Sequence, residues 1–226
     1  MGEDRKLKAV GRRASRVDAV ALVTGSAIYS ADVQIPGALH ARFLHSPHPH
    51  ARIRRLDATR ARALPGVVAV LTAADTPDLD LFPRDEVCFQ GQKVAMVAAE
   101  DPEVAEDALA LIRVRYEVLP AVWDPVAGMD PDAPEARLGA PTRESRDADG
   151  RLRRNVVGAS ELVEGDVAAG FAAADVVVES EYRIPYFHQT YLELSCATAR
   201  PEGNGRVTVW TSTQGTFAIR DQVAGK

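Results

Sequence analysis

The 226-residue sequence has few cysteines and no long apolar run, and both scarcities narrow what the chain can be. Cys88 and Cys196 lie far apart without a C-x-x-C spacing, so these thiols alone cannot build a zinc site or an iron–sulfur cluster. We expect both to be reduced, buried, small apolar side chains. No apolar stretch approaches the ~20 residues that a membrane-spanning helix needs, which argues against a membrane protein.

The common nucleotide-binding and hydrolase motifs are also missing. The sequence contains no G-x-G-x-x-G, P-loop, G-x-S-x-G or H-E-x-x-H pattern, so nothing supports those chemistries. The net charge is −5 and the basic residues are dispersed outside the N-terminal tail, which argues against nucleic acid as the main partner. The opening MGEDRKLKAVGRRASRVDA lacks the apolar centre of a signal peptide, so we expect a cytoplasmic protein.

Short strand and helix signals fill the segment from about Val23 to Asp124, and they predict one compact domain. Apolar runs predict strands at 66–72 and 93–99. Asp101-Pro102 then supplies an N-cap and first helical residue, and the following apolar residues recur with a helical period. From Arg113 the period changes to two residues, which predicts a further strand at 113–118.

A change of composition marks the second half of the chain. Residues 126–155 are rich in proline, glycine and charge, which is typical of a linker or a long surface connection. Asp166 then caps a predicted short helix whose Val167 and Phe171 should face inward. Alternation of apolar and charged residues predicts a strand at 176–184 with Glu179 and Glu181 on its solvent face, and a last strand at 206–211.

Three histidines lie close together in LHSPHPHARI, at His45, His48 and His50. The H-x-x-H-x-H spacing could supply metal ligands. However, Pro47 and Pro49 favour an extended loop, and no carboxylate lies beside the histidines in the sequence to orient them. The better interpretation is a loop with solvated histidines.

Polar residues set among aromatic and apolar ones distinguish the C-terminal stretch YFHQTYLELSCATARPEGNGRVTVWTSTQGTF. We expect Gln189 and Glu193 on the first strand of a hairpin that pairs across PEGNG, and Gln214 at the end of its second strand. Buried amides need hydrogen-bond partners, and Gln214 lies before Gly215 at a strand end, where it could reach a cavity. The alternative is a structural turn without a ligand.

Taken in order, these segments resemble the large, molybdenum-cofactor subunit of the xanthine dehydrogenase and aldehyde oxidase family. The resemblance covers the chain from about Gly11 to Lys226 and is carried by RVDAVALVTGSAIYSADVQIPGALHARFLHSPHPHARI, GVVAVLTAAD, FQGQKVAMVAAEDPEVAEDALALIRVRYEVLPAVWDP, ASELVEGDVAAGFAAADVVVESEYRIPYFHQTYLEL and VTVWTSTQGTF. It implies an α+β fold: a tail at 1–18, an α/β hammerhead domain at 19–125, a linker at 126–155, and the beginning of a mixed α/β molybdopterin-binding domain at 156–226.

The resemblance also implies a site. Gln214 matches the glutamine that contacts the molybdenum centre, and Gly215 adjoins it; Gln189, Glu193 and Phe217 would line the wall of the site. No residue of the chain would bind the metal directly, and the catalytic set would be incomplete, because the family's glycine-rich R-x-G-G-x-F-G-G-K segment and glutamate base find no match. We therefore expect either the N-terminal part of a longer subunit or one half of a divided one, inactive by itself.

The implied activity is hydroxylation of a small N-heterocycle, purine or aldehyde with oxygen from water. Molybdopterin would be shared with a missing C-terminal region or a second molybdopterin-binding chain, and electrons would leave through 2Fe-2S and FAD subunits. A non-catalytic assembly or scaffold subunit is the alternative, and an unrelated α+β binding module is a third interpretation. The sequence does not identify the substrate, the oligomeric state or the final electron acceptor.

Overall fold

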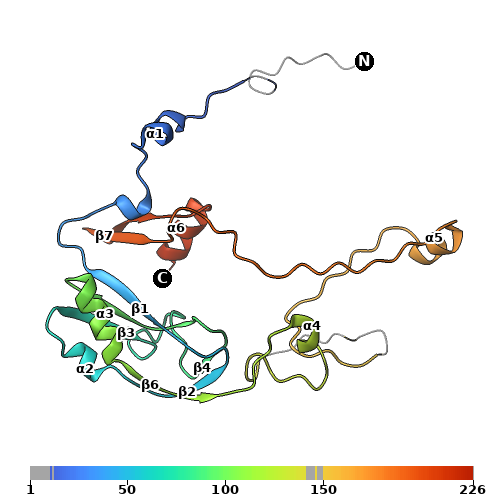
Figure 1. Cartoon of the computed structure of the whole chain (residues 1–226), viewed down its shortest axis with the longest axis horizontal. Coiled ribbons are helices and arrows are strands. Elements are labelled where there is room, and N and C mark those ends of the chain that lie inside the picture. Colours follow the sequence, from blue (N-terminus) through green and yellow to red (C-terminus); the bar gives the residue numbers. More distant parts are fainter. Residues whose placement is uncertain (1–10, 12, 141–145, 147–149, 226) are drawn as a thin grey trace. The chain divides into compact units, whose positions relative to one another are not determined.

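The computed structural model describes residues 11, 13–140, 146 and 150–225 (Figure 1). The chain forms two compact units. The larger comprises residues 37–184, and the smaller combines residues 1–36 with residues 185–226. The smaller unit therefore joins segments from opposite ends of the sequence.

Two antiparallel three-stranded sheets form the frame of the larger unit. Strand β5 lies in the middle of the first sheet and β2 in the middle of the second. The first sheet has the order β1 (His40–His45), β5 (Lys93–Ala99) and β3 (Val67–Thr72), and the second has the order β4 (Glu86–Val87), β2 (Ala51–Asp57) and β6 (Arg113–Val118). The sequence-predicted strands at 66–72, 93–99 and 113–118 are thereby confirmed to within one residue.

Helix α3 (Pro102–Leu111) packs against the first sheet, and its sequence explains both its start and its position. The side chain of Asp101 accepts a hydrogen bond of 2.7 Å from the backbone N–H of Glu103, as predicted for an N-cap. Ala105 and Ala108 are fully buried on the face toward the sheet. Because alanine side chains are small, the helix backbone can approach the sheet closely.

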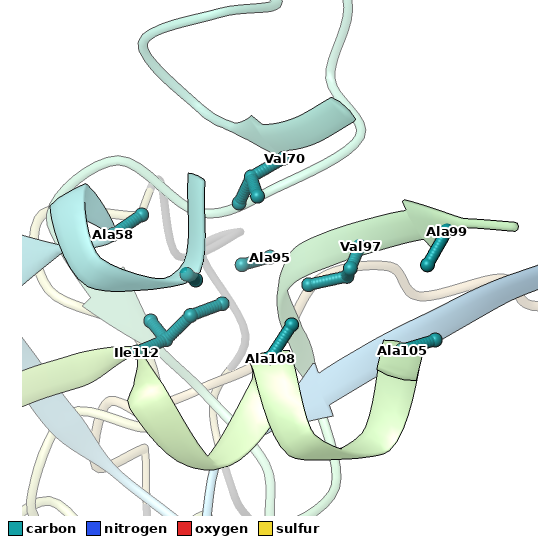
Figure 2. Close-up of a cluster of buried hydrophobic side chains, with 9 residues drawn as sticks. Ala58, Val70, Ala95, Val97, Ala99, Ala105, Ala108 and Ile112 are labelled. Atoms are coloured by element: carbon teal, nitrogen blue, oxygen red, sulfur yellow. The ribbon is translucent and has the colours of Figure 1, made fainter. Parts of the chain in front are cut away.

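The main apolar core lies between α3, the short helix α2 (Thr59–Arg62) and strands β3 and β5 (Figure 2). Ala58, Val97 and Ile112 come from separate parts of the chain and meet in this cluster. A smaller cluster of Ala51, Val87 and Val94 connects β2, β4 and β5. These two clusters hold the sheets together, since burial of apolar surface stabilises by about 25 cal/mol per Å².

Residues after β6 form a surface connection that is pinned by hydrogen bonds. Helix α4 (Pro125–Gly128) begins at Asp124, whose side chain accepts from the N–H groups of Val126 and Ala127. The side-chain amide of Asn155 donates to the carbonyls of Gly128 and Pro134 and accepts from the N–H of Ala136. The domain boundaries proposed at 125/126 and 155/156 stay predictions.

The smaller unit is built around a β-hairpin. Strands β7 (Ala197–Gly203) and β8 (Arg206–Thr211) pair antiparallel, which confirms the hairpin predicted across PEGNG. Asn204 and Gly205 both have positive φ, as the favoured two-residue hairpin turn requires. Helix α6 (Thr216–Ala224) follows β8, while α1 (Ala19–Thr24) and the short 3-10 helix η1 (Ser30–Asp32) come from the N-terminal segment.

Two sequence-based expectations for residues 166–184 are wrong in part. Helix α5 (Val167–Ala173) begins at Asp166 as predicted, but Val167 and Phe171 are more than half exposed. Residues 176–184 form no strand, and Val178 is 83% exposed. Strand geometry is stabilised by pairing with a neighbour, and within the described residues this segment has no neighbouring strand.

Across the described residues, every helix is too short or too polar to cross a lipid bilayer. The expected cytoplasmic location stays a prediction.

Replacing Asp101 by alanine should lower the free energy of unfolding by about 1 kcal/mol, because the Glu103 N–H loses its capping acceptor. Urea unfolding followed by circular dichroism measures this change. Asp107→Ala, at an exposed position inside the same helix, is the matched control. Equal destabilisation by the two variants would contradict the capping role.

Asp75 should make stability depend on pH at acidic values. Hydrogen bonds from Thr72, and then the charge of Arg62, lower the pKa of Asp75 below its ordinary 3.8. A carboxyl group whose pKa is depressed by folding stabilises above the unfolded pKa, and this contribution is lost as pH falls through the folded value.

The stability advantage of the wild-type chain over Asp75→Asn should therefore be present at pH 6 and shrink below about pH 3.8. Urea unfolding at pH 6, 4 and 2.5 checks this expectation. Asp78→Asn is the control, because the exposed Asp78 carboxylate has no hydrogen-bond partner among the described residues. A difference between wild type and Asp75→Asn that is independent of pH would refute the assignment.

Candidate functional site

Residues 212–215 form a Ser-Thr-Gln-Gly turn between strand β8 and helix α6. The N–H of Gly215 donates to the hydroxyl of Thr213 at 3.0 Å, and the hydroxyl of Ser212 donates to the carbonyl of Leu194 at 3.3 Å. The turn is therefore fixed at both ends. The Gln214 side chain is exposed and has no hydrogen-bond partner in the part of the chain that the structure describes.

Helix α6 starts directly after this turn without a side-chain cap. Its N-cap residue is Gly215, and the first backbone hydrogen bond of the helix joins the N–H of Ile219 to the Gly215 carbonyl at 3.0 Å. The N–H groups of residues 216–218 consequently have no partner within the helix. Together with the positive end of the helix dipole, they favour an electron-rich acceptor beside the Gln214 amide.

Phe217 lies in the first turn of α6 and is 72% exposed. The guanidinium of Arg220 lies over its ring, 5.2 Å from the centroid, and also pairs with Asp221. One face of the ring is thereby occupied by a cation of the same helix. Gln214, Gly215 and Phe217 are thus brought together on one exposed end of the smaller unit.

Glu193 is linked to the Ser-Thr-Gln-Gly turn through the next residue, Leu194. Its Oε1 accepts hydrogen bonds from the hydroxyl and the N–H of Ser30, at 2.8 and 3.3 Å. Leu194, the next residue, is the acceptor for Ser212. The predicted role of Glu193 as a hydrogen-bonding residue of the site wall stays a prediction, but sequence reasoning missed Ser30, because no spacing indicates a partner 163 residues away.

Gln189 is exposed, and the structure shows no hydrogen bond between its side chain and any described residue. The predicted strand conformation of Gln189 and Glu193 is wrong, since β7 begins only at Ala197. Thr190 has a positive φ of 55°, and its N–H donates to the His188 ring instead of to a neighbouring strand. Such local side-chain bonds compete with sheet pairing.

The histidine cluster differs from the predicted loop with solvated histidines, because His45 ends strand β1 and His48 is only partly exposed. His45 is exposed, but His50 is only 3% exposed, and its Nε2 lies 2.6 Å from Oε1 of Glu86. Its Nδ1 lies 2.6 Å from the carbonyl oxygen of Pro120. The carboxylate that seemed missing in the sequence comes from strand β4, which the tertiary structure places beside β2. His50 therefore joins elements of the fold.

Among the described residues, no group of three or more histidine, cysteine, aspartate or glutamate side chains could hold a metal ion.

Both cysteines are free and only partly buried, so the expectation that they are buried is wrong. Burial, and then the charge of Glu86, raise the pKa of the Cys88 thiol. A raised pKa keeps this thiol protonated and unreactive at neutral pH.

Two family models match the chain in succession. The aldehyde oxidase and xanthine dehydrogenase a/b hammerhead domain matches residues 24–120, and the molybdopterin cofactor-binding domain matches residues 150–226. Together they span most of the sequence, with a gap inside the surface connection.

Curated relatives and solved structures agree with these matches. The carbon monoxide dehydrogenase large chain of Afipia carboxidovorans is 35% identical over 97% of this chain and 29% of its own length. The nicotinate dehydrogenase large molybdopterin subunit of Eubacterium barkeri is 31% identical over 100% of this chain and 52% of its own length. The structure of quinoline 2-oxidoreductase from Pseudomonas putida 86 superposes with a TM-score of 0.77 at 28% identity, over 97% of this chain and 29% of that one.

The fold and the order of the two domains are those of large, molybdopterin-binding subunits, of which this chain matches a part. The chain belongs to the aldehyde oxidase and xanthine dehydrogenase family. The predicted family and the predicted fold class, a hammerhead domain followed by the start of a molybdopterin-binding domain, are confirmed. The chain spans less than a third of the carbon monoxide dehydrogenase subunit and about half of the nicotinate dehydrogenase subunit.

Replacing His50 by phenylalanine should lower the free energy of unfolding by about 1–3 kcal/mol, since the buried His50 ring loses its hydrogen bonds to the Pro120 carbonyl and the Glu86 carboxylate. Thermal and urea unfolding measure the change. His45→Phe, at an exposed position five residues earlier, should have a much smaller effect. If the two variants were equally stable, the ring of His50 would not join these elements in solution.

Proposed function

We propose that this chain supplies the hammerhead domain and one wall of a molybdenum-cofactor site in an oxidoreductase that hydroxylates a small organic substrate with oxygen from water. The observation that carries the proposal is the match of residues 150–226 to a molybdopterin cofactor-binding domain, together with the donor-rich turn that this region presents. The substrate class would be an N-heterocycle, a purine or an aldehyde.

The residues of the turn fit a cofactor with electron-rich oxygen atoms. The Gln214 amide and the first N–H groups of α6 are hydrogen-bond donors without partners among the described residues. A primary amide is uncharged, so it donates without placing a competing negative charge beside the acceptor. When bound, the molybdenum cofactor supplies the redox chemistry, and the protein supplies binding and orientation.

Gly215 also fits close approach of a ligand. A Cβ at this position would meet only the Ala218 Cβ at 3.7 Å, and the φ of −132° is accessible to other residues. Neither crowding inside the chain nor backbone strain therefore requires a glycine here. A glycine lets a bound group approach the backbone N–H groups, which is a further use of this residue type.

Catalysis would need further residues, because the proposed contacts of Gln214 and Gly215 provide no general base. Molybdopterin would be shared with a further region or with a second molybdopterin-binding chain, and electrons would pass through 2Fe-2S to FAD on partner subunits. A non-catalytic scaffold subunit, in which the hammerhead only docks other chains, is the competing function.

Gln214→Ala in the assembled enzyme should reduce kcat by about 100- to 1,000-fold, the range for removing one donor that stabilises charge in a transition state. Molybdenum content should stay near that of the wild type, since Gln214 is one of several donors. Steady-state kinetics and metal analysis of the same preparation measure both quantities. Gln222→Ala, an exposed glutamine on the same helix, is the matched control.

Unchanged turnover of the Gln214→Ala enzyme, at full molybdenum content, would contradict the cofactor contact and favour the scaffold function. A loss of turnover that Gln222→Ala reproduces would show that any change in α6 disturbs assembly. The two variants together therefore separate a contact with the cofactor from a general effect on the helix.

A further inference from the structure

The Glu193 carboxylate connects two segments that lie at opposite ends of the sequence. Oε1 accepts the Ser30 hydroxyl at 2.8 Å and the Ser30 N–H at 3.3 Å, in a partly buried position. Ser30 begins the 3-10 helix η1, and Asp32 in this helix accepts the N–H of Tyr29 at 2.9 Å. The N-terminal partner of Glu193 is thus a locally fixed element.

From Glu193 the connection continues to the Ser-Thr-Gln-Gly turn through the next three residues. The Leu194 carbonyl accepts the Ser212 hydroxyl at 3.3 Å. The Cys196 carbonyl accepts the Thr211 hydroxyl at 3.1 Å and the Ser212 N–H at 3.4 Å. The carbonyls of Leu194 and Cys196 therefore hold the end of β8 and Ser212, which lies two residues before Gln214.

We propose that Glu193 is a positioning residue for Gln214, and that Ser30 is its anchor. This inference rests on the proposed function. The carboxylate fixes the segment 193–196 against η1, and that segment holds the turn from which Gln214 reaches the cofactor. Glu193 acts through hydrogen bonds to Ser30 and touches neither substrate nor cofactor.

The geometry argues for this role over proton transfer. Both hydrogen bonds that the structure shows for Glu193 come from Ser30, and both end on Oε1. Hydrogen bonds to an ionised acceptor are about twice as strong as neutral ones, so a carboxylate suits an anchor that ties two segments. An amide retains an acceptor oxygen, so glutamine should preserve most of the connection.

The test uses the assembled enzyme with Glu193→Ala, Glu193→Gln, Ser30→Ala and Gln214→Ala. Glu193→Ala should lower kcat on the order of 10- to 100-fold, the cost of a misplacement of about 1 Å. It should also change the Mo(V) electron paramagnetic resonance spectrum in the same direction as Gln214→Ala. Glu193→Gln should retain most of the activity, and Ser30→Ala should fall between the two.

Ser195→Ala is the matched control, because Ser195 lies in the same segment but donates to the Tyr191 hydroxyl instead of to η1 or the turn. It should leave kcat and the spectrum unchanged. Should Glu193→Ala fail to assemble, Ser30→Ala still decides, since a merely structural role would leave its Mo(V) spectrum in the wild-type form, whereas the positioning role requires a change.

The outcomes also separate this inference from the proposed function. If Gln214→Ala lowers turnover while Glu193→Ala and Ser30→Ala match the wild type, the positioning role is wrong and the cofactor contact stands. If Gln214→Ala has no effect, the proposed function itself fails. If Glu193→Gln is as inactive as Glu193→Ala, the charge of Glu193 matters beyond its hydrogen bonds, which overturns the positioning role.

Discussion

Close packing between helix α3 and strand β5 is the constraint on which the larger unit depends. Ala105 and Ala108 of the helix are fully buried against Ala95, Val97 and Ala99 of the strand, so mostly small side chains fill the contact between the two elements. A larger residue would have to displace either element, and overpacking of this kind costs about 1–3 kcal/mol. The α2 helix and strand β3 complete the core around this contact (Figure 2).

Hydrogen bonds to two carboxylates join segments of the chain that the apolar core does not hold together. Glu86 accepts a hydrogen bond from the N–H of Leu138 and is also bonded to the His50 ring. One carboxylate therefore joins β4, the start of β2 and the surface connection. In the smaller unit, Glu193 has a comparable role, because it joins η1 to the segment before β7. Both carboxylates are partly buried, where an unpaired charge would be costly and a satisfied one specifies a single arrangement.

In the smaller unit, the hairpin leads into a turn whose hydrogen-bond donors have no partner among the described residues, and the proposed function rests on this turn. The hairpin and α6 fix the backbone on either side of Gln214, while its side chain lies in solvent. The Asn204-Gly205 turn sets the hairpin, and the Leu194 and Cys196 carbonyls hold residues 211 and 212, so the backbone before Gln214 is fixed in advance of any ligand. Such preorganised donors contribute most where charge develops during a reaction.

The sequence by itself determined the local elements of this protein and its family. Strand β5, helix α3 with its Asp101 cap, and the Asn204-Gly205 hairpin all follow from periodicity and turn chemistry, which depend on neighbouring residues. The identity of Gln214 as a site candidate came from the ordered motifs. Tertiary structure alone decided that His50 meets Glu86 and that Ser30 meets Glu193, because these partners lie 36 and 163 residues apart. Strand pairing fails at 176–184 for the same reason: alternation predicts a strand, but only a neighbouring strand stabilises it.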